Sequence, residues 1–361
     1  MKKIGILTFH RALNYGALLQ AYSLQRVLVD NGYDAELVDY RCKFIESYYV
    51  PLWKKIFISP KRFLAGIIFN GDILRRRDEF EEFTRTDITV SSNKYENLMD
   101  LSLIQDQYDY FITGSDQVWS PVCAGFDKAY FLDFVVEKSK KKSYAASFGV
   151  SLIPEEMKTE YRKLLKNFDR ITVREEEGQR LVEQIIGIEP PLVVDPTLLL
   201  NKLEWLELCG DTLLSEKDFI LVYLITEDSE VLSFAKKLSE KTGKKIIYIN
   251  DRIIKRFGMD NKSNVSVKEW ISYFMKADYV VTNSFHGVAF SVNFNKEFYV
   301  RYIPGAKVNS RISGILSRLN LEARIIPDSM DISTKKINYT NIEKDISVMR
   351  NDSKDVLFSM L

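Results

Sequence analysis

The first forty residues carry the pattern that most restricts the fold of this chain. Residues 4–9 form a short, almost continuous apolar run, which is typical of a buried strand. Apolar residues then recur at helical spacing over residues 18–28, with Asn14 in front as an N-cap and Gly32 behind as a stop signal. Residues 35–40 read as a second strand. A strand, a helix and a strand in this order predict a parallel sheet with a right-handed crossover.

The same alternation continues along the chain and predicts an α/β protein with two doubly wound, Rossmann-like domains. A length of 361 residues exceeds one average core. We expect an N-terminal domain over residues 1–205 with an insertion at about 43–107, a C-terminal domain over 206–330, and a C-terminal segment, 331–361, that carries an amphipathic helix. Further strands are predicted at 108–113, 142–148, 170–173, 192–194, 219–225, 245–249, 278–282 and 297–302, and helices at 155–167, 175–186, 230–241, 267–275, 286–293 and 310–319.

Composition and charge exclude several classes of protein. The formal net charge is only +1, whereas a nucleic-acid-binding protein normally carries a strong basic bias, so we expect no nucleic-acid partner. The three cysteines, Cys42, Cys123 and Cys209, are widely spaced and predict neither a disulfide framework nor a zinc site. The N-terminus lacks the profile of a signal peptide, and the longest apolar run, 63–69, is far short of the roughly 20 residues that span a membrane. We therefore expect a cytoplasmic protein.

Common catalytic and cofactor motifs are absent from the sequence. No G-x-G-x-x-G follows a predicted strand, and no Walker A, G-x-S-x-G or H-E-x-x-H sequence occurs. The chain contains only two histidines, His10 and His286, so a histidine-rich metal site is not available. We expect neither a bound metal nor a resident cofactor.

Polar and glycine residues gather where the predicted strands end. Ligands of doubly wound domains bind outside the carboxyl ends of the strands, so these residues are the candidates for a cleft between the two domains. After strands of the first domain come His10, Asn14, Tyr15, Gly16, Gly114, Ser115, Asp116, Gln117, Ser147 and Arg174, and after a strand of the second come Ser284, His286 and Gly287.

Each candidate has a structural alternative that the sequence leaves open. His286 opens a predicted helix whose N-terminus favours an anion, and its imidazole could transfer a proton near neutral pH; it could equally be a buried capping residue. Arg174 suits a carboxylate or phosphate, or it pairs with Glu175 or Glu176 at the surface. Asn14 can be a helix cap alone, and residues 114–117 can be a tight turn.

Six short motifs in register resemble those of the polysaccharide pyruvyl transferase family. They extend over most of the chain, from about Ile4 to Tyr302. One motif alone is weak, but six in the same order are specific at the level of a family. The motifs are residues 10–20 with Asn14-Tyr15-Gly16-Ala17 inside them, Gly114-Ser115-Asp116-Gln117-Val118-Trp119, Ala146-Ser147-Phe148-Gly149, Val173-Arg174-Glu175, Asp195-Pro196-Thr197 and Ser284-Phe285-His286-Gly287.

The resemblance implies a fold similar to the two-domain GT-B glycosyltransferases. It also implies transfer of a pyruvyl group from phosphoenolpyruvate, as a co-substrate, to two hydroxyls of a saccharide, which forms a cyclic ketal in surface or exopolysaccharide biosynthesis. His286 and Arg174 would match a catalytic, donor-binding pair. This chain has Ser284 where some members carry a basic residue. Arg301, Lys307 and Arg311 follow closely enough to add positive charge for the donor, or they are solvent-exposed.

Two other functions compete with this expectation. The same architecture would suit a nucleotide-sugar glycosyltransferase, in which the turn at 284–287 binds the diphosphate, although no acidic ribose-binding residue stands in a convincing place. A non-catalytic saccharide-binding protein of the same pathway is the third hypothesis. The presence of both His286 and Arg174 favours an enzyme.

The predicted insertion contains a strongly basic segment. Residues 50–77 hold seven basic residues and one acidic residue, interleaved with aromatic and aliphatic side chains. Such a segment can bind an anionic membrane surface, which would suit a lipid-linked acceptor and place the protein at the inner face of the membrane. Packing on the domain core and a dimer interface are the alternatives.

Overall fold

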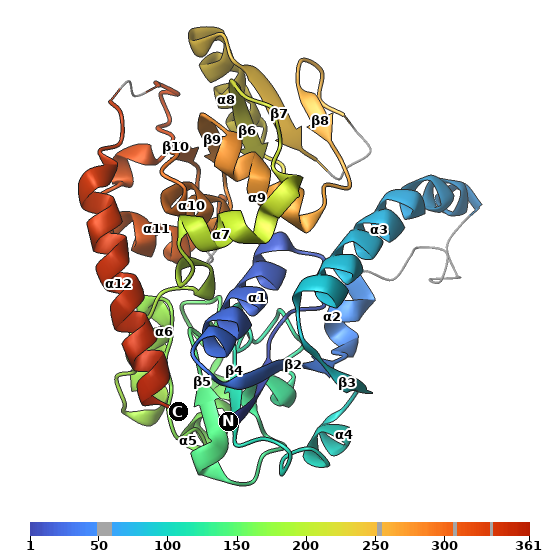
Figure 1. The fold of residues 1–361 in the computed structure, drawn as a ribbon, viewed down its shortest axis with the longest axis vertical. Coiled ribbons are helices and arrows are strands. Elements are labelled where there is room, and N and C mark those ends of the chain that lie inside the picture. Colours follow the sequence, from blue (N-terminus) through green and yellow to red (C-terminus); the bar gives the residue numbers. More distant parts are fainter. Residues whose placement is uncertain (49–59, 251–254, 306–308, 333–334) are drawn as a thin grey trace. The chain divides into compact units, whose positions relative to one another are not determined.

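We describe the protein from a computed structural model that covers residues 1–48, 60–250, 255–305, 309–332 and 335–361, with the side chains of Tyr48 and of residues 60–73 left aside (Figure 1). These residues form two five-stranded sheets in which every pair of neighbouring strands is parallel. Helices follow the strands in both halves, so the predicted α/β class with two doubly wound sheets is confirmed.

The first sheet has the strand order β3-β2-β1-β4-β5. The helix that follows its first strand is capped by Asn14, whose side chain accepts a hydrogen bond from the amide of Ala17, as the sequence predicted. That helix packs on β2. The strands are β1 (Lys3–Leu7), β2 (Asp34–Tyr40), β3 (Val90–Tyr95), β4 (Tyr110–Thr113) and β5 (Lys141–Ser143), and the helices of this half are α1 (Tyr15–Asp30), α2 (Lys43–Tyr48), α3 (Pro60–Asp87), α4 (Leu98–Ser102), α5 (Lys158–Lys166) and α6 (Glu176–Ile186).

Three predicted strands are wrong in extent. The strand expected at 142–148 ends at Ser143, and residues 170–173 and 192–194 form only isolated bridges. Ala145 has a φ of 54°, in the left-handed region that a strand cannot contain. Hydroxyl groups add to the backbone hydrogen bonds between the two segments. Thr172 donates its amide to Oγ of Ser143 at 3.0 Å and accepts the amide of Ala145 on Oγ1 at 3.0 Å.

Part of the predicted insertion belongs to the sheet. Strand β3 pairs in parallel with β2 and forms the edge of the sheet. Its sequence, Val-Ser-Ser-Asn-Lys-Tyr, is mostly polar and exposed, which explains why no apolar run marked it. Of the basic, aromatic segment at 50–77, residues 50–59 lie outside the described residues and residues 60–77 belong to α3.

The second sheet has the strand order β10-β9-β6-β7-β8. Helix α8 packs on the two central strands β6 and β7, and its last turn ends at Gly243, whose φ of 69° is of the kind that glycine adopts readily. The elements are β6 (Phe219–Tyr223), α8 (Ser229–Thr242), β7 (Lys245–Ile249), β8 (Asp260–Lys262), α9 (Val267–Lys276), β9 (Tyr279–Thr282), α10 (Phe285–Asn293), β10 (Glu297–Val300) and α11 (Asn309–Arg318), with α7 (Lys202–Cys209) before them and α12 (Tyr339–Ser359) after them.

The chain divides into two compact units. Unit 1 consists of Met1–Val50, Glu81–Leu200 and Ser347–Leu361, and unit 2 of Pro51–Phe80 and Asn201–Ile346. Helices α3 and α12 each contribute residues to both units.

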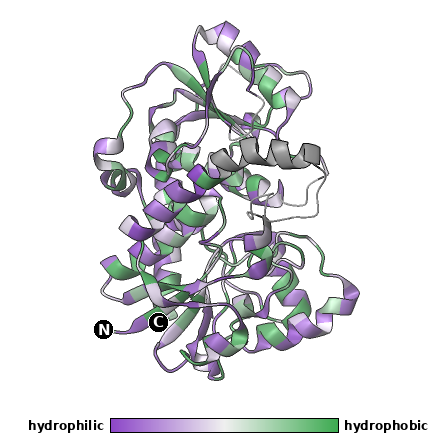
Figure 2. Cartoon of the chain, turned by 90° about the vertical axis from the view of Figure 1, so that its right-hand side faces the viewer, coloured by the Kyte–Doolittle hydropathy of each residue, from purple (hydrophilic) through white to green (hydrophobic). Residues whose placement is uncertain are grey.

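Each unit has its own apolar core. The strands bury residues such as Ile6 and Phe111 in unit 1 and Val222 and Val281 in unit 2. Hydrophobic and hydrophilic residues alternate along the surrounding helices, as expected of helices with one face on a sheet (Figure 2). Within the part of the chain that the structure describes, no helix combines the length and the apolar character needed to cross a membrane.

Candidate functional site

The strand orders define one point in each sheet where a ligand is expected. In a doubly wound sheet the chain winds outward in both directions from its first strand, and ligands bind at the carboxyl ends of the two strands where the direction reverses. In unit 1 these strands are β1 and β4, and in unit 2 they are β6 and β9. The segments that follow these four strands contain most of the site residues predicted from the sequence.

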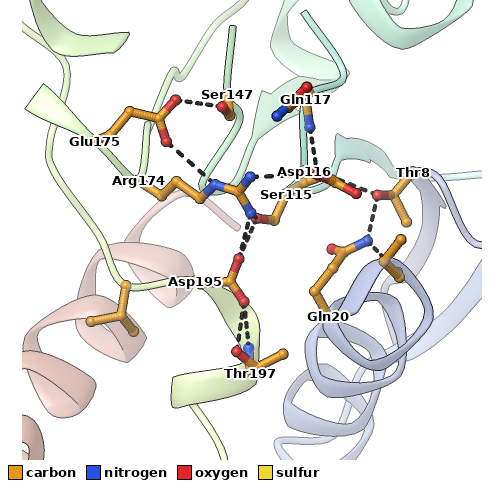
Figure 3. A network of polar contacts seen from close by, with 12 residues as sticks. Thr8, Gln20, Ser115, Asp116, Gln117, Ser147, Arg174, Glu175, Asp195 and Thr197 are labelled. Atoms are coloured by element: carbon orange, nitrogen blue, oxygen red, sulfur yellow. Dashed lines mark hydrogen bonds and ion pairs between the residues drawn. The ribbon is translucent and has the colours of Figure 1, made fainter. Parts of the chain in front are cut away.

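Several of the predicted site residues of unit 1 meet in one buried polar network around Arg174 (Figure 3). Its Nη1 donates to Oδ2 of Asp195 at 2.5 Å and to Oγ of Ser115 at 2.9 Å. Its Nε donates to Glu175 at 3.3 Å, and Nη2 lies 3.4 Å from Oδ1 of Asp116. The Arg174 side chain is only 1% exposed, so its pairing with Glu175 is part of the interior and not of the surface.

The charge balance of this network is unusual for a site that binds an anion. One guanidinium faces the carboxylates of Asp195, Glu175 and Asp116. Burial lowers the pKa of Arg174, but these carboxylates outweigh burial, and the pKa is raised above its usual value. The guanidinium therefore stays charged and is already neutralised by protein groups.

Asp116 is the network's charged residue with appreciable exposure. Its side chain is 16% exposed, against 5% for Glu175 and 0% for Asp195. Its φ of 73° lies in the left-handed region, where aspartate is tolerated better than most residues. The Gln117 amide donates to Oδ1 at 2.9 Å, so residues 114–117 do form a tight turn whose side chains also join the network.

The segments around the network are joined to it by hydroxyl groups. Ser147 donates its amide to the carbonyl of Asp116 at 3.1 Å and its hydroxyl to Glu175. The hydroxyl of Thr8, after β1, donates to the carbonyl of Ser115 at 2.9 Å and accepts from Gln20 at 2.7 Å. The ends of β1 and β4 are thus fixed relative to each other, as Figure 3 shows.

The remaining candidates of unit 1 lie at the start of α1. Asn14 is its N-cap, and Tyr15 and Gly16 are buried in its first turn. His10 is buried in the loop before the helix, with Nδ1 at 3.1 Å from the carbonyl oxygen of Thr8. Burial is the main cause that lowers the pKa of His10, although the nearby Asp39 acts in the opposite direction. His10 is therefore neutral at physiological pH.

In unit 2 the predicted residues Ser284, His286 and Gly287 form the start of α10. Ser284 is the N-cap and accepts a hydrogen bond from the amide of Gly287 at 3.2 Å. Ser284 therefore serves the helix at the position where some family members carry a basic residue. His286 is the second residue of the helix and only 6% exposed, and the first turn contains no acidic residue. The helix end keeps its preference for a negative group.

Asn283 is a site residue that the sequence analysis did not single out. Its side chain accepts the amide of Ile225 at 2.9 Å and donates to the carbonyl of Thr226 at 2.7 Å. It therefore joins the end of β9 to the end of β6, next to His286. An asparagine directly after an apolar strand was the available signal.

Gly287 makes possible the close approach of α10 to β9, and this gives a stability prediction. A Cβ at Gly287 would overlap Oγ1 of Thr282, which is itself fixed because it donates to the carbonyl of Tyr223 at 2.6 Å. We expect Gly287→Ala to lower the free energy of unfolding by about 1–3 kcal/mol. Gly314→Ala in α11 is the matched control, because its Cβ meets nothing within 4 Å, and it should gain up to about 1 kcal/mol. Urea unfolding measures both; equal effects of the two changes would contradict the argument.

The three cations predicted to assist the donor are placed differently. Arg301 follows β10 and is flanked by carboxylates of Asp228, Glu230 and Asp328. Arg311 places its guanidinium 5.8 Å from the ring of Phe285, at the start of α10. Lys307 lies outside the described residues. Arg311 is thus near the helix N-terminus, whereas Arg301 already has acidic partners.

No group of three or more His, Cys, Asp or Glu side chains is arranged to hold a metal ion among the residues that the structure describes.

Two parallel, doubly wound units with polar residues at the strand ends define a GT-B-like α/β protein. The S. aureus MnaA–UDP co-structure is similar, with a TM-score of 0.51 at 12% identity over 98% of this chain and 91% of that chain. UDP-GlcNAc 2-epimerase from Methanocaldococcus jannaschii has a TM-score of 0.49 at 12% identity, over 97% of this chain and 93% of that chain. E. coli ADP-heptose lps heptosyltransferase II has a TM-score of 0.41 at 10% identity, over 98% of this chain and 100% of that chain. No curated protein matches the chain.

The model of the polysaccharide pyruvyl transferase family matches residues 14–302. This match spans most of the chain, and the chain belongs to that family. The resemblance seen in the six sequence motifs is thereby confirmed.

Proposed function

We propose that this protein transfers a pyruvyl group from phosphoenolpyruvate to two hydroxyls of a saccharide and forms a cyclic ketal. Family membership supports the reaction class. The observation that carries the proposal is the position of His286 at the N-terminus of α10, after the strand β9 where the winding of the second sheet reverses. A helix N-terminus favours an anion, and an imidazole there can donate a proton to it or to the substrate.

The chemistry needs one acid and one anion-binding element. His286 protonates the methylene carbon of phosphoenolpyruvate, and a saccharide hydroxyl attacks the resulting cationic carbon. The second hydroxyl closes the ring as phosphate leaves. One hydroxyl proton replaces the proton given to the methylene carbon and the other leaves with phosphate, so the sum is phosphoenolpyruvate plus a diol giving a ketal plus phosphate. The start of α10 and the nearby Arg311 bind the donor.

Arg174 belongs to unit 1 and His286 to unit 2, so their joint contact with the donor stays a prediction. Because three carboxylates already surround Arg174, we propose that its first task is to hold Asp116, Asp195 and Glu175 in place. Ser115, Asp116, Gln117 and Ser147 would then offer a neutral saccharide an array of hydrogen-bonding groups.

The location of the reaction and the carrier of the acceptor also stay predictions. A cytoplasmic enzyme in exopolysaccharide biosynthesis would meet lipid-linked acceptors at the inner face of the membrane, where the basic segment 50–77 could bind anionic lipid. Flotation with anionic vesicles at low and high salt tests this contact.

The proposed function is tested by donor binding and product formation. Phosphoenolpyruvate should raise the melting temperature of the protein by mass action. With saccharides as acceptors, the enzyme should release inorganic phosphate and form a ketal that mass spectrometry detects. A shift with UDP alone would favour the nucleotide-sugar glycosyltransferase instead, and binding of saccharide without turnover would favour the non-catalytic alternative.

A further inference from the structure

Two arginines share one carboxylate at the carboxyl edge of the first sheet. Arg11 follows β1 and Arg41 follows β2. Asp39 is the second-last residue of β2. Oδ1 of Asp39 lies 2.7 Å from Nη2 of Arg11 and 2.8 Å from Nε of Arg41, and Nη2 of Arg41 donates to Oδ2 at 3.1 Å. The Asp39 side chain is 6% exposed, whereas those of Arg11 and Arg41 are 17% and 18% exposed.

This arrangement leaves positive charge at the buried centre of the cluster. Two guanidinium groups face a single buried carboxylate, and each repels the other, which is one cause that lowers the pKa of Arg11 after burial itself. Burial would raise the pKa of Asp39, but contacts with His10, Arg41 and Arg11 hold it far below its usual range. Asp39 is therefore ionised, and the three groups together carry one excess positive charge.

Among the described residues, the further acidic groups that act on the two arginines stand at the rim of the cluster. Glu46 on α2, with its side chain 39% exposed, approaches Nη1 of Arg41 at 3.4 Å. Glu81 acts on Arg11 electrostatically and is exposed. An exposed ion pair of this kind contributes little and is easily exchanged for another anion.

The guanidinium group of Arg11 keeps a donor without a partner among the described residues. Among the described residues, Nη1 of Arg11 donates no hydrogen bond. Behind the arginines, Nε2 of His10 is buried and without a hydrogen-bond partner in the described part of the chain, since the 3.9 Å to Asp39 is too long for one. A buried polar atom in this state is uncommon. Because Nδ1 faces the carbonyl of Thr8 and carries the proton of the neutral imidazole, Nε2 is an acceptor and suits a water molecule or a protonated ligand oxygen.

We propose that Arg11 and Arg41 form a subsite for a phosphate group, built from other residues than the network around Arg174 and the start of α10. The planar guanidinium fork matches phosphate oxygens in pairs, and two forks at one point suit a tetrahedral dianion. The inference deepens the proposed function. Only the identity of the phosphate rests on that function: it belongs either to the carrier of the saccharide acceptor or to phosphoenolpyruvate.

Binding of three probes without turnover tests the subsite and identifies the source of the phosphate. The probes are inorganic phosphate, phosphoenolpyruvate and UDP-N-acetylglucosamine, titrated calorimetrically at low salt. Arg11→Gln and Arg41→Gln should each weaken the binding of inorganic phosphate at least about tenfold, because a charge-assisted hydrogen bond is lost. The control is Arg26→Gln on α1 of the same unit, which removes the same charge from an exposed pair with Asp30 and should change nothing.

The variants are chosen so that a folding defect cannot imitate the result. Each single change leaves Asp39 paired with the other arginine, and the melting temperature reports the fold. Glu46→Gln should tighten phosphate binding severalfold, because it removes the carboxylate that competes for Arg41. A gain of affinity cannot come from unfolding.

The pattern across the probes decides the inference. If the arginine variants weaken the binding of UDP-N-acetylglucosamine but not that of phosphoenolpyruvate, the subsite binds the phosphate of the acceptor. If they weaken the binding of phosphoenolpyruvate, it binds the phosphate of the donor. If phosphate binding is unchanged in both variants, or falls equally in Arg26→Gln, the subsite does not exist. These titrations do not depend on ketal formation, so a failed transfer assay and a failed subsite remain separate results.

Discussion

Replacing Arg174 with methionine is expected to lower the free energy of unfolding by about 3–5 kcal/mol, because it leaves buried carboxylates without their common cation. Asp195, Glu175 and Asp116 would keep the hydroxyl and amide groups that donate to them. Denaturant unfolding measures the change. The matched control is Arg180→Met on α6, where the side chain is 64% exposed and pairs with Glu177 at the surface. Its effect should stay within about 0.5 kcal/mol.

Acid should partly restore the Arg174→Met protein. A buried carboxylate that has lost its cation has a pKa above that of the unfolded chain, so the folded state binds more protons and is stabilised as the pH falls. The loss measured at a pH of about 7.5 should therefore shrink at about 5.5. Adding Asp195→Asn should recover part of the loss as well, which a double-mutant cycle quantifies. If Arg174→Met behaves like Arg180→Met, the network does not stabilise the unit.

This expectation differs from the one that the sequence supports. From the sequence, Arg174 is a cleft-facing arginine or a surface partner of Glu175 or Glu176. The carboxylate that approaches most closely belongs to Asp195, which lies 21 residues further along the chain. A contact between residues so far apart depends on how strand ends meet in the fold, and no local pattern contains it.

The central strands of both sheets were predictable because they are buried on two faces and therefore read as apolar runs. The edge strands β3 and β8 were missed for the opposite reason, since their residues are largely polar and only partly buried. Strand ends were overestimated where Ala145 leaves the extended region of backbone conformation. Periodicity shows which residues are buried, whereas a single backbone angle decides where a strand stops.

The site was predictable to the extent that strand ends are local features. Residues 114–117 and 284–287 stand directly after strands, and the structure places both segments where the winding of their sheets reverses. The arginine pair was not predictable in the same way. Arg11 and Arg41 are 30 residues apart, and only the parallel pairing of β1 with β2 brings them to one carboxylate.

Replacing His286 with glutamine is expected to reduce the rate of ketal formation about 10²–10⁴-fold, because glutamine hydrogen-bonds but transfers no proton at neutral pH. Glutamine is chosen in place of alanine because the residue is only 6% exposed and a cavity would confuse the result. The initial rate of phosphate release with saturating phosphoenolpyruvate and acceptor measures the effect. The melting temperature shows whether the fold survives.

A second variant on α10 separates proton transfer from general damage to the helix. Ser291→Ala removes a buried hydroxyl that donates to the carbonyl of Gly287, one turn further from the helix N-terminus. It perturbs the same helix without touching the imidazole, so it should keep nearly full activity. If both variants lose activity in proportion to their melting temperatures, His286 is a structural residue. If only His286→Gln is slow, with phosphoenolpyruvate still bound, the acid that protonates the donor is His286, because the start of α10 that attracts the anion is unchanged.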